Sequence, residues 1–342
     1  PRLARIDRSG QLTSWLPVLS GDNDIGWVTA LHVFDNALYV ASVQPLVGTS
    51  IDAFDITNGV QLPFHVTVSG WVYALSRSGN VIYIAGDFSS VAGARRANLA
   101  AVNASTGAVR AWNPLADIRR PPVTRTLITS GSTVYTAGAT GAIAFEGSGD
   151  GNALPEWPPS GCSLNGPARI ADGTYYALTP TRLERVDLTT GACSPLVLSG
   201  TGEGLDLLIH DGVATVARLN GSVSAQNIEL ASGQVVAEVR SNIPDRPNRG
   251  GHLIEIGDKV GLELDPGESG LRAPISIGVV QRNHLAAVDE AGRLTDWTAS
   301  ADGRVTALER LGDDLLIGGQ FVTVNDADVP YLALRVGVGS EG

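Results

Sequence analysis

Short stretches of alternating apolar and polar residues recur along the chain, and the clearest set lies within residues 71–114. Side chains of a strand point alternately to its two faces, so this alternation predicts strands at 72–75, 81–88 and 99–102. A fourth strand is expected at 108–112, after a short turn. Four strands in about 45 residues is the size of one blade of a β-propeller.

The same pattern returns, decayed to varying degrees, through the rest of the sequence. We expect the first strand of each copy to begin near residues 27, 71, 123, 167–168, 205, 252 and 305. Repeat folds grow by adding units around one axis and need no second core. The copies therefore predict a single domain over residues 1–342.

Each third strand is expected to lead into a tight hairpin turn, which Asp, Asn or Glu usually opens and Gly closes. An Asx side chain can accept a hydrogen bond from the backbone two residues on, and Gly supplies the positive φ that a tight reversal requires. These third-strand segments lie at 3–10, 51–59, 99–107, 183–191, 228–233 and 285–292.

Four copies place a tryptophan in the expected outermost strand. A large ring at that position can lie between neighbouring blades and bury an area that no single sheet covers alone. The four residues are Trp15, Trp112, Trp157 and Trp297.

The two ends of the chain predict how the ring closes. Residues 2–17 read as the third and fourth strands of a blade whose first two strands, 305–308 and 315–321, lie near the C-terminus. Residues 331–336 also read as a third strand, so two segments compete for one position. The predicted fold is all-β: a seven-bladed β-propeller of four-stranded antiparallel blades, closed by N-terminal strands that join the C-terminal blade.

Composition agrees with one all-β body and narrows the partners. The 342 residues are 43% hydrophobic and 17% charged, and no apolar run is long enough to span a membrane. The formal net charge is −11 and Lys259 is the only lysine, which argues against nucleic acid as a partner. The preference for Arg, Ala, Gly and Val is typical of GC-rich coding, and suggests a bacterial source.

Two features favour an extracellular location. The sequence contains no Met, which indicates a processed mature chain, an excised fragment or removal of Met ahead of Pro1, and any signal peptide would already be gone. Cys162 and Cys193 flank the fourth repeat, where adjacent outer strands meet, and we expect them to form a disulfide. Two unpaired thiols, or a two-Cys metal site, are the alternatives.

The second and third strands of 72–114 and of 285–336, together with residues 2–17, resemble the bacterial delta-sixty family of β-propeller repeats. That resemblance implies a secreted or surface protein in which the propeller is a recurring module. It brings no catalytic residues. Residues 99–112 are also similar to the docking pattern of quinoprotein blades, but the vicinal Cys pair that usually covers the quinone is absent, so we expect no quinone.

No catalytic motif of a common hydrolase or nucleotide enzyme is present, and catalytic residues stay unassigned. No two of the five histidines have a metal-ligand spacing. His32, His210 and His252 are the candidates for ligand binding, because innermost strands line the centre of a propeller, where several blades converge. His65 and His284 are expected on outer or third strands.

Charged loops supply the remaining candidates. Arg95 and Arg96 lie in one connection between second and third strands, where they offer a binding surface, and Asp326 and Asp328 lie in another. The two aspartates are candidate ligands of a structural calcium ion, and no other cofactor is expected. Residues 241–251 are expected to form a surface loop between blades.

Two functions from different classes stay open. The first is a non-catalytic extracellular propeller that binds protein or polysaccharide on one face, or that is a structural subunit of a homo-oligomer or larger assembly. The second is a carbohydrate-active enzyme, a glycosidase or polysaccharide lyase, with its site at the mouth of the central channel. An aromatic rim would favour the first, and buried groups with shifted pKa values would favour the second.

Overall fold

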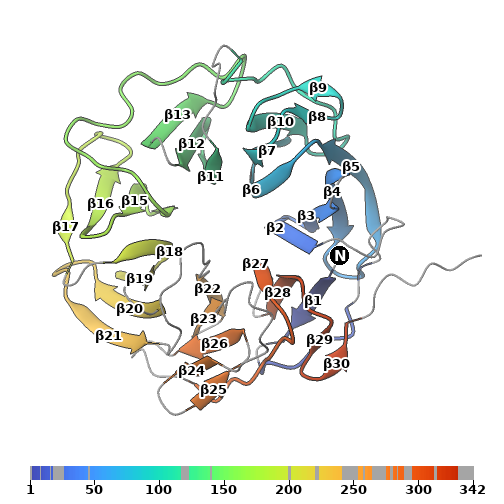
Figure 1. The fold of residues 1–342 in the computed structure, drawn as a ribbon. Helices are drawn as coiled ribbons and strands as arrows, with labels where there is room; N and C mark the ends of the chain where they lie inside the picture. Colours follow the sequence, from blue (N-terminus) through green and yellow to red (C-terminus); the bar gives the residue numbers. More distant parts are fainter. Residues whose placement is uncertain are drawn as a thin grey trace, which may run out of the picture.

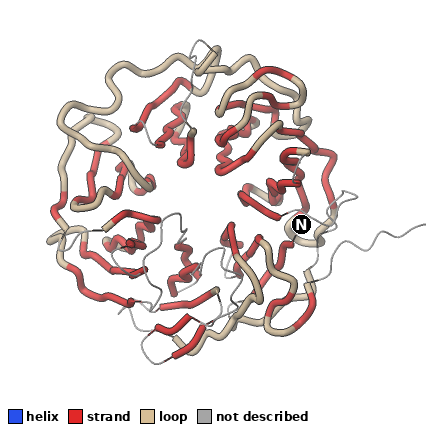
Figure 2. The backbone as a smooth tube through the Cα atoms, in the orientation of Figure 1, coloured by secondary structure: helices blue, strands red, loops and turns tan. Residues whose placement is uncertain are grey.

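The fold is all-β, and its sheets are arranged around a common centre (Figure 1). The computed structural model describes residues 2–7, 9–15, 17, 27–44, 47–116, 123–138, 141–198, 202–219, 223–240, 253–256, 259–263, 275–277, 280–282, 284–288, 295–311 and 314–329. Over these residues the backbone consists of strands and loops alone (Figure 2). They include no helix that is long and apolar enough to cross a membrane.

Neighbouring strands within each sheet are antiparallel. The sheet nearest the N-terminus contains β2 (Trp27–Phe34), β3 (Ala37–Gln44), β4 (Gly48–Asp55) and β5 (Gln61–Val68), extended by the short β8 (Ser90–Val91) and β9 (Ala94–Arg95). The next two sheets contain β6 (Trp71–Ser78), β7 (Val81–Asp87) and β10 (Leu99–Asn103), and then β11 (Thr124–Ser130), β12 (Thr133–Gly138) and β13 (Gly141–Glu146).

Two sheets have four strands. They are β14 (Ala168–Ala171), β15 (Thr174–Leu178), β16 (Arg182–Asp187) and β17 (Leu196–Val197), followed by β18 (Glu203–His210), β19 (Val213–Leu219), β20 (Val223–Glu229) and β21 (Val235–Arg240).

The C-terminal part of the chain contributes the remaining sheets. They are β22 (Leu253–Ile256), β23 (Lys259–Glu263) and β26 (Leu285–Val288); the pair β24 (Ile275–Ile277) and β25 (Val280–Arg282); β27 (Val305–Leu311) and β28 (Asp314–Gly319), which take up β1 (Arg2–Ile6); and the hairpin β29 (Thr323–Val324) and β30 (Ala327–Asp328).

Strands begin within two residues of every position predicted for a first strand, at Trp27, Trp71, Thr124, Ala168, Glu203, Leu253 and Val305. The predicted fourth strand at 108–112 is wrong. After a single bridge from Val102 to Val109 this segment turns away, because Trp112 is buried against the neighbouring sheet and its indole N–H donates to the Glu146 carbonyl at 2.7 Å. Four strands per sheet is therefore the pattern in only part of the described chain.

β1 pairs antiparallel with β28 in the register Arg2↔Gly319 to Ile6↔Leu315. An ion pair between Arg5 Nη2 and Asp314 Oδ2, 2.6 Å apart, joins the same two strands. The pairing between the N-terminal segment and the second C-terminal strand is therefore the predicted one. The competing segment, 331–336, lies outside the described residues, as does the predicted loop at 241–251.

The hydrophobic core lies between neighbouring sheets, and the four tryptophans contribute to it, but each lies in a loop and not in the predicted outermost strand. Trp112 packs against Phe145 of the next sheet with 6.2 Å between ring centroids. Trp157 lies between Tyr135 and Tyr175 with its ring centroid about 5 Å from each (4.9 and 5.0 Å). Trp15 and Trp297 are also buried in clusters that combine residues of adjacent sheets.

The predicted hairpin turns form as expected where the structure describes them, and the turn at the end of 285–292 lies outside the described residues. Asp55 Oδ1 accepts hydrogen bonds from the backbone N–H groups of Thr57 and Asn58, and Gly59 has φ +73°. The same arrangement recurs at Asn103 and Asp187, with Gly107 and Gly191 each at φ +71°. Local turn chemistry therefore fixes where each third strand ends.

Candidate functional site

Five of the innermost strands, though not β14 and β22, share a register irregularity that changes the direction of one side chain in each. β2, β6, β11, β18 and β27 lie nearest the centre in Figure 1, and the register of each shifts by one residue close to its start. A β-bulge of this kind leaves one residue unpaired and re-aims it. The residues at the shift are Thr29, Tyr73, Arg125, Leu205 and Thr306.

Two stacked pairs, Trp27 with Trp71 and Tyr73 with Arg125, lie at the start of the adjacent strands β2, β6 and β11, and we call them together the aromatic cluster. The Trp27 and Trp71 rings are 5.4 Å apart between centroids and tilted by 47°. Trp71 is 38% exposed, and it is the only aromatic residue among the exposed large hydrophobic residues of the described chain. The Arg125 guanidinium lies over the Tyr73 ring at 4.7 Å. The cluster therefore combines exposed ring surface with a positive charge.

A histidine and a glutamate lie close together between β2 and β27, the first and last of the innermost strands. His32 of β2 and Glu309 of β27 approach to 3.8 Å between Nδ1 and Oε1, and each side chain is 25% exposed. The backbone N–H of Val33 donates to Glu309 Oε1 at 2.7 Å. His32 Nε2 is buried without a hydrogen-bond partner among the described residues. Glu309 thus links the two sheets through one carboxylate oxygen.

Burial shifts the pKa values of this pair in opposite directions. It lowers the pKa of His32 to about 4, with the Arg77 charge acting in the same sense. It raises the pKa of Glu309 to about 7, although the hydrogen bond from Val33 and the Arg169 charge both oppose the shift. Near neutral pH the imidazole is therefore uncharged and the carboxyl group is partly protonated, so the 3.8 Å contact is not an ion pair.

Arg169 of β14 occupies the position in its strand that is equivalent to those of His32 in β2 and Glu309 in β27. It faces Tyr176 of the next strand, as His32 faces Tyr39 and Glu309 faces Leu316. Its Nη2 lies 2.8 Å from Asp206 Oδ1 on the neighbouring sheet. The carboxylate of Asp206 is therefore already paired with a guanidinium.

A groove of about 490 Å³ lies further out, between the second and third sheets. Its walls combine aromatic, hydroxyl and guanidinium groups, chiefly Tyr83, Arg110, Trp112, Ser132 and Ser148. The Tyr83 hydroxyl, one of the polar groups of the groove, donates to the Gly147 carbonyl at 2.6 Å and is already satisfied. No carboxylate side chain lines the groove.

Of the predicted ligand-binding histidines, the described pair His32 and His210 does not come together. His210 ends β18, across the ring from β2 (Figure 1), and its Nε2 lies 3.1 Å from Asp211 at the hairpin turn. His252 lies outside the described residues. His65 binds Asp52 within one sheet at 2.8 Å, as an outer-strand residue should. Ligand binding by His32 stays a prediction.

The predicted charged loops form short hairpins at the outer edge of the ring (Figure 1). Arg95 is exposed on β9, whereas Arg96 donates to the Arg110 carbonyl at 2.6 Å and so holds its own repeat together. Asp326 and Asp328 are exposed on β29–β30 and belong to no cluster of three metal-ligating side chains among the described residues. Calcium binding there stays a prediction.

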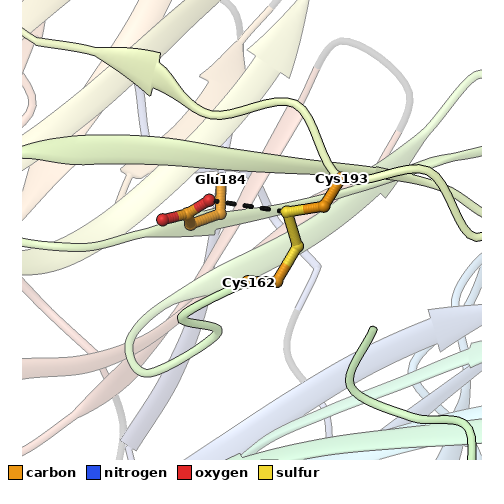
Figure 3. Close-up of side chains that lie close together, drawn as sticks. All are labelled: Cys162, Glu184 and Cys193. Atoms are coloured by element: carbon orange, nitrogen blue, oxygen red, sulfur yellow. Dashed lines mark hydrogen bonds between the residues drawn. A yellow bond between two sulfur atoms is a disulfide. The ribbon is translucent and has the colours of Figure 1, made fainter. Parts of the chain in front are cut away.

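Cys162 and Cys193 form the predicted disulfide, with 6.1 Å between their Cα atoms. They also form, with Glu184, the only cluster of three metal-ligating side chains within the described part of the chain (Figure 3).

Sequence reasoning passed over the aromatic cluster and Glu309. A usable signal was present, because Glu309 occupies the same place in its repeat as His32, and Trp71 the same place as Trp27. Aligning the repeats by position, rather than searching for motifs, would have found both.

No family model matches the chain, and no curated protein matches it. Among solved structures it is similar to the computationally designed Ika8 protein, at 14% identity and a TM-score of 0.54, covering 90% of this chain and 98% of that one. It is also similar to U3-55K, at 11% identity and a TM-score of 0.56, covering 88% and 97%. BamB from Moraxella catarrhalis matches at 14% identity and a TM-score of 0.48, covering 86% and 85%. Identities this low show the fold alone, and that fold is all-β and propeller-like.

Proposed function

We propose that this chain is a non-catalytic, secreted or cell-surface β-propeller that binds a polysaccharide through the aromatic cluster. The observation that carries the proposal is the exposed Trp71 ring beside Trp27, with Tyr73 two residues further along the same strand and stacked against Arg125. The negative face of an aromatic ring attracts the C–H groups of a sugar face. A guanidinium donates to sugar hydroxyl or carboxylate oxygens.

The finer architecture belongs to this proposal. Seven blades are supported by the seven strand starts that recur at equivalent positions, and closure of the ring by the pairing of β1 with β28. Membership of the delta-sixty repeat family is supported by the repeated Asx and Gly turns. The disulfide supports an oxidising, extracellular location.

A glycan array followed by affinity measurement tests the binding function. We expect the chain to bind a polysaccharide, and Trp71→Ala to weaken that binding at least about tenfold, or about 1.4 kcal/mol. Val197→Ala serves as the control, because it removes an exposed apolar side chain far out on β17. Unchanged binding by Trp71→Ala, or no bound glycan at all, would contradict the proposal.

A carbohydrate-active enzyme is the second candidate, and the opposite pKa shifts of His32 and Glu309 favour it. A neutral imidazole beside a partly protonated carboxyl group offers a base and an acid. If this function is correct, incubation with the bound polysaccharide yields shorter products, and Glu309→Gln abolishes them. Binding without product in the wild type excludes it.

A further inference from the structure

Glu184 is a buried carboxylate to which no described residue donates a hydrogen bond. Its residue is 1% exposed on β16, and its Oε2 lies 3.8 Å from Cys193 Sγ, the contact drawn in Figure 3. A disulfide sulfur carries no hydrogen, so this contact cannot be a hydrogen bond while Cys162 and Cys193 are joined. Burying a carboxylate without a donor is costly. The position of Glu184 therefore requires an explanation.

Two other repeats have a polar side chain at the same position, and each of them binds a side chain of the fourth strand. Asp52 occupies it in the first sheet and accepts from Gln61 Nε2 at 3.0 Å, with His65 Nδ1 at 2.8 Å. Gln226 occupies it in the fifth sheet and donates to Glu238 Oε1 at 3.0 Å. In each case the partner lies on the fourth strand. In the sheet of Glu184, that partner is the cysteine pair.

We propose that the reduced form of this chain binds a zinc-like divalent cation through Cys162, Cys193 and Glu184. The three ligand atoms lie within 4.8 Å of one another. Two thiolates and one carboxylate are ligands that Zn²⁺ accepts, and a site with three protein ligands leaves the fourth position to water. Both cysteines are half-buried, so water can reach the metal. The cation also neutralises the buried carboxylate.

The chemistry balances in two steps. A phosphine reductant breaks the S–S bond and becomes a phosphine oxide by taking oxygen from water, while the two sulfurs gain protons as thiols. Zn²⁺ then displaces both thiol protons, because only the thiolate is a ligand. The sulfurs move apart to about 3.8 Å, as Zn–S bonds of about 2.3 Å in a tetrahedron require. The disulfide and the metal are therefore mutually exclusive occupants.

The test uses the full chain, reduced with a phosphine without oxygen, and Co²⁺ as a spectroscopic substitute for Zn²⁺. We expect one Co²⁺ per chain, bound with release of two protons and giving thiolate charge-transfer bands and tetrahedral d–d bands, and we expect Zn²⁺ to displace it. The oxidised chain is expected to give neither band. Absence of these bands in the folded, reduced chain would overturn the proposal.

Variants separate the role of Glu184 from that of the thiols. We expect Glu184→Gln to weaken metal binding by at least the roughly tenfold loss that removing an outer-shell partner already causes. Cys162→Ser should abolish the charge-transfer signature of a two-thiolate site. Glu156→Gln is the matched control, because it makes the same chemical change at an exposed residue nearby. Equal affinities for Glu184→Gln and the wild type would exclude Glu184 as a ligand and overturn the three-ligand site.

Reduction itself can unfold the chain, and circular dichroism distinguishes that case. If the β-sheet spectrum is lost on reduction, the proposal requires Zn²⁺ to restore it, because a cation that binds only the folded form stabilises that form. Failure of Zn²⁺ to restore the spectrum would then overturn the proposal as well.

Discussion

Burial in the folded chain reverses the protonation states that His32 and Glu309 have in water. Between pH 4.5 and 6.5 the folded chain keeps a proton on Glu309 and none on His32, whereas the unfolded chain does the reverse. The stability that the raised pKa of Glu309 contributes is complete below pH 4.5 and is lost as pH rises through 7. The contribution of His32 is present above pH 6.5 and is lost as pH falls through 4. Between pH 4.5 and 6.5 the two groups change the free energy of unfolding with pH in opposite directions, and the two changes cancel.

Single substitutions should uncover each dependence. Relative to the wild type, Glu309→Gln leaves the His32 effect alone, so its free energy of unfolding should rise with pH between 4 and 6.5. His32→Asn should show the reverse, a fall between pH 4.5 and 7. The slope is at most about 1.4 kcal/mol per pH unit, the value for one proton. Urea unfolding at several pH values measures it.

Comparison with the wild type at each pH removes the contribution of the other carboxylates. The double variant is the control, and its difference from the wild type should be independent of pH between 4.5 and 6.5. Parallel pH profiles for both single variants would show that the two groups are not coupled to folding.

Among the structural elements, the hairpin turns after the third strands all reverse the chain, and one of them also contacts the neighbouring sheet. Gly107 and Gly191 have the same φ of +71°, which only glycine adopts without strain. They differ in their surroundings. A Cβ on Gly107 would lie 2.9 Å from Val66 Cγ2 of the neighbouring sheet, whereas a Cβ on Gly191 would meet nothing within 4 Å. The first turn therefore also contacts the adjacent sheet.

We expect Gly107→Ala to destabilise the chain more than Gly191→Ala. Both substitutions carry the strain of a positive φ, roughly 1 kcal/mol, and only Gly107→Ala adds a clash between sheets. Urea denaturation of the two variants gives the difference directly. Equal losses of stability would mean that the turn of Gly107 moves freely relative to the first sheet.

On the scale of the whole molecule, β1 near the start of the chain shares one sheet with β27 and β28, which come about 300 residues later. Leu3, Ala4 and Ile6 of β1 are buried, and Trp15 packs against the first sheet. Burial of one large aliphatic side chain contributes about 1.5–3 kcal/mol. The N-terminal strand therefore stabilises sheets on both of its sides.

Deleting residues 1–17 should lower the free energy of unfolding by at least about 3 kcal/mol, from the lost burial of Leu3 and Ile6 alone. Circular dichroism during urea denaturation measures the loss. A synthetic peptide of residues 1–17 should restore stability in proportion to the logarithm of its concentration. If the deletion leaves the unfolding curve unchanged, β1 does not hold the molecule together.

Much of the fold could be predicted from the sequence because its signals are local. The alternation in 81–88 and the turn from Asn103 to Gly107 depend on residues close together in the chain. The contact of Glu309 with Val33 joins residues 276 positions apart, so no short window contains it. Glu184 was missed for a similar reason, because its lack of a donor appears only when its sheet neighbours are known.

The pairing of β1 with β28 also sets the order of events during synthesis. Arg5 and its partner Asp314 are 309 positions apart. At a translation rate of 5–20 residues per second, β1 leaves the ribosome roughly 15–60 s before the strand that completes it. During that interval an apolar strand has an unpaired edge, which is the kind of segment that aggregates or recruits a chaperone. Yield of the soluble protein should therefore depend on how quickly the last sheet is made.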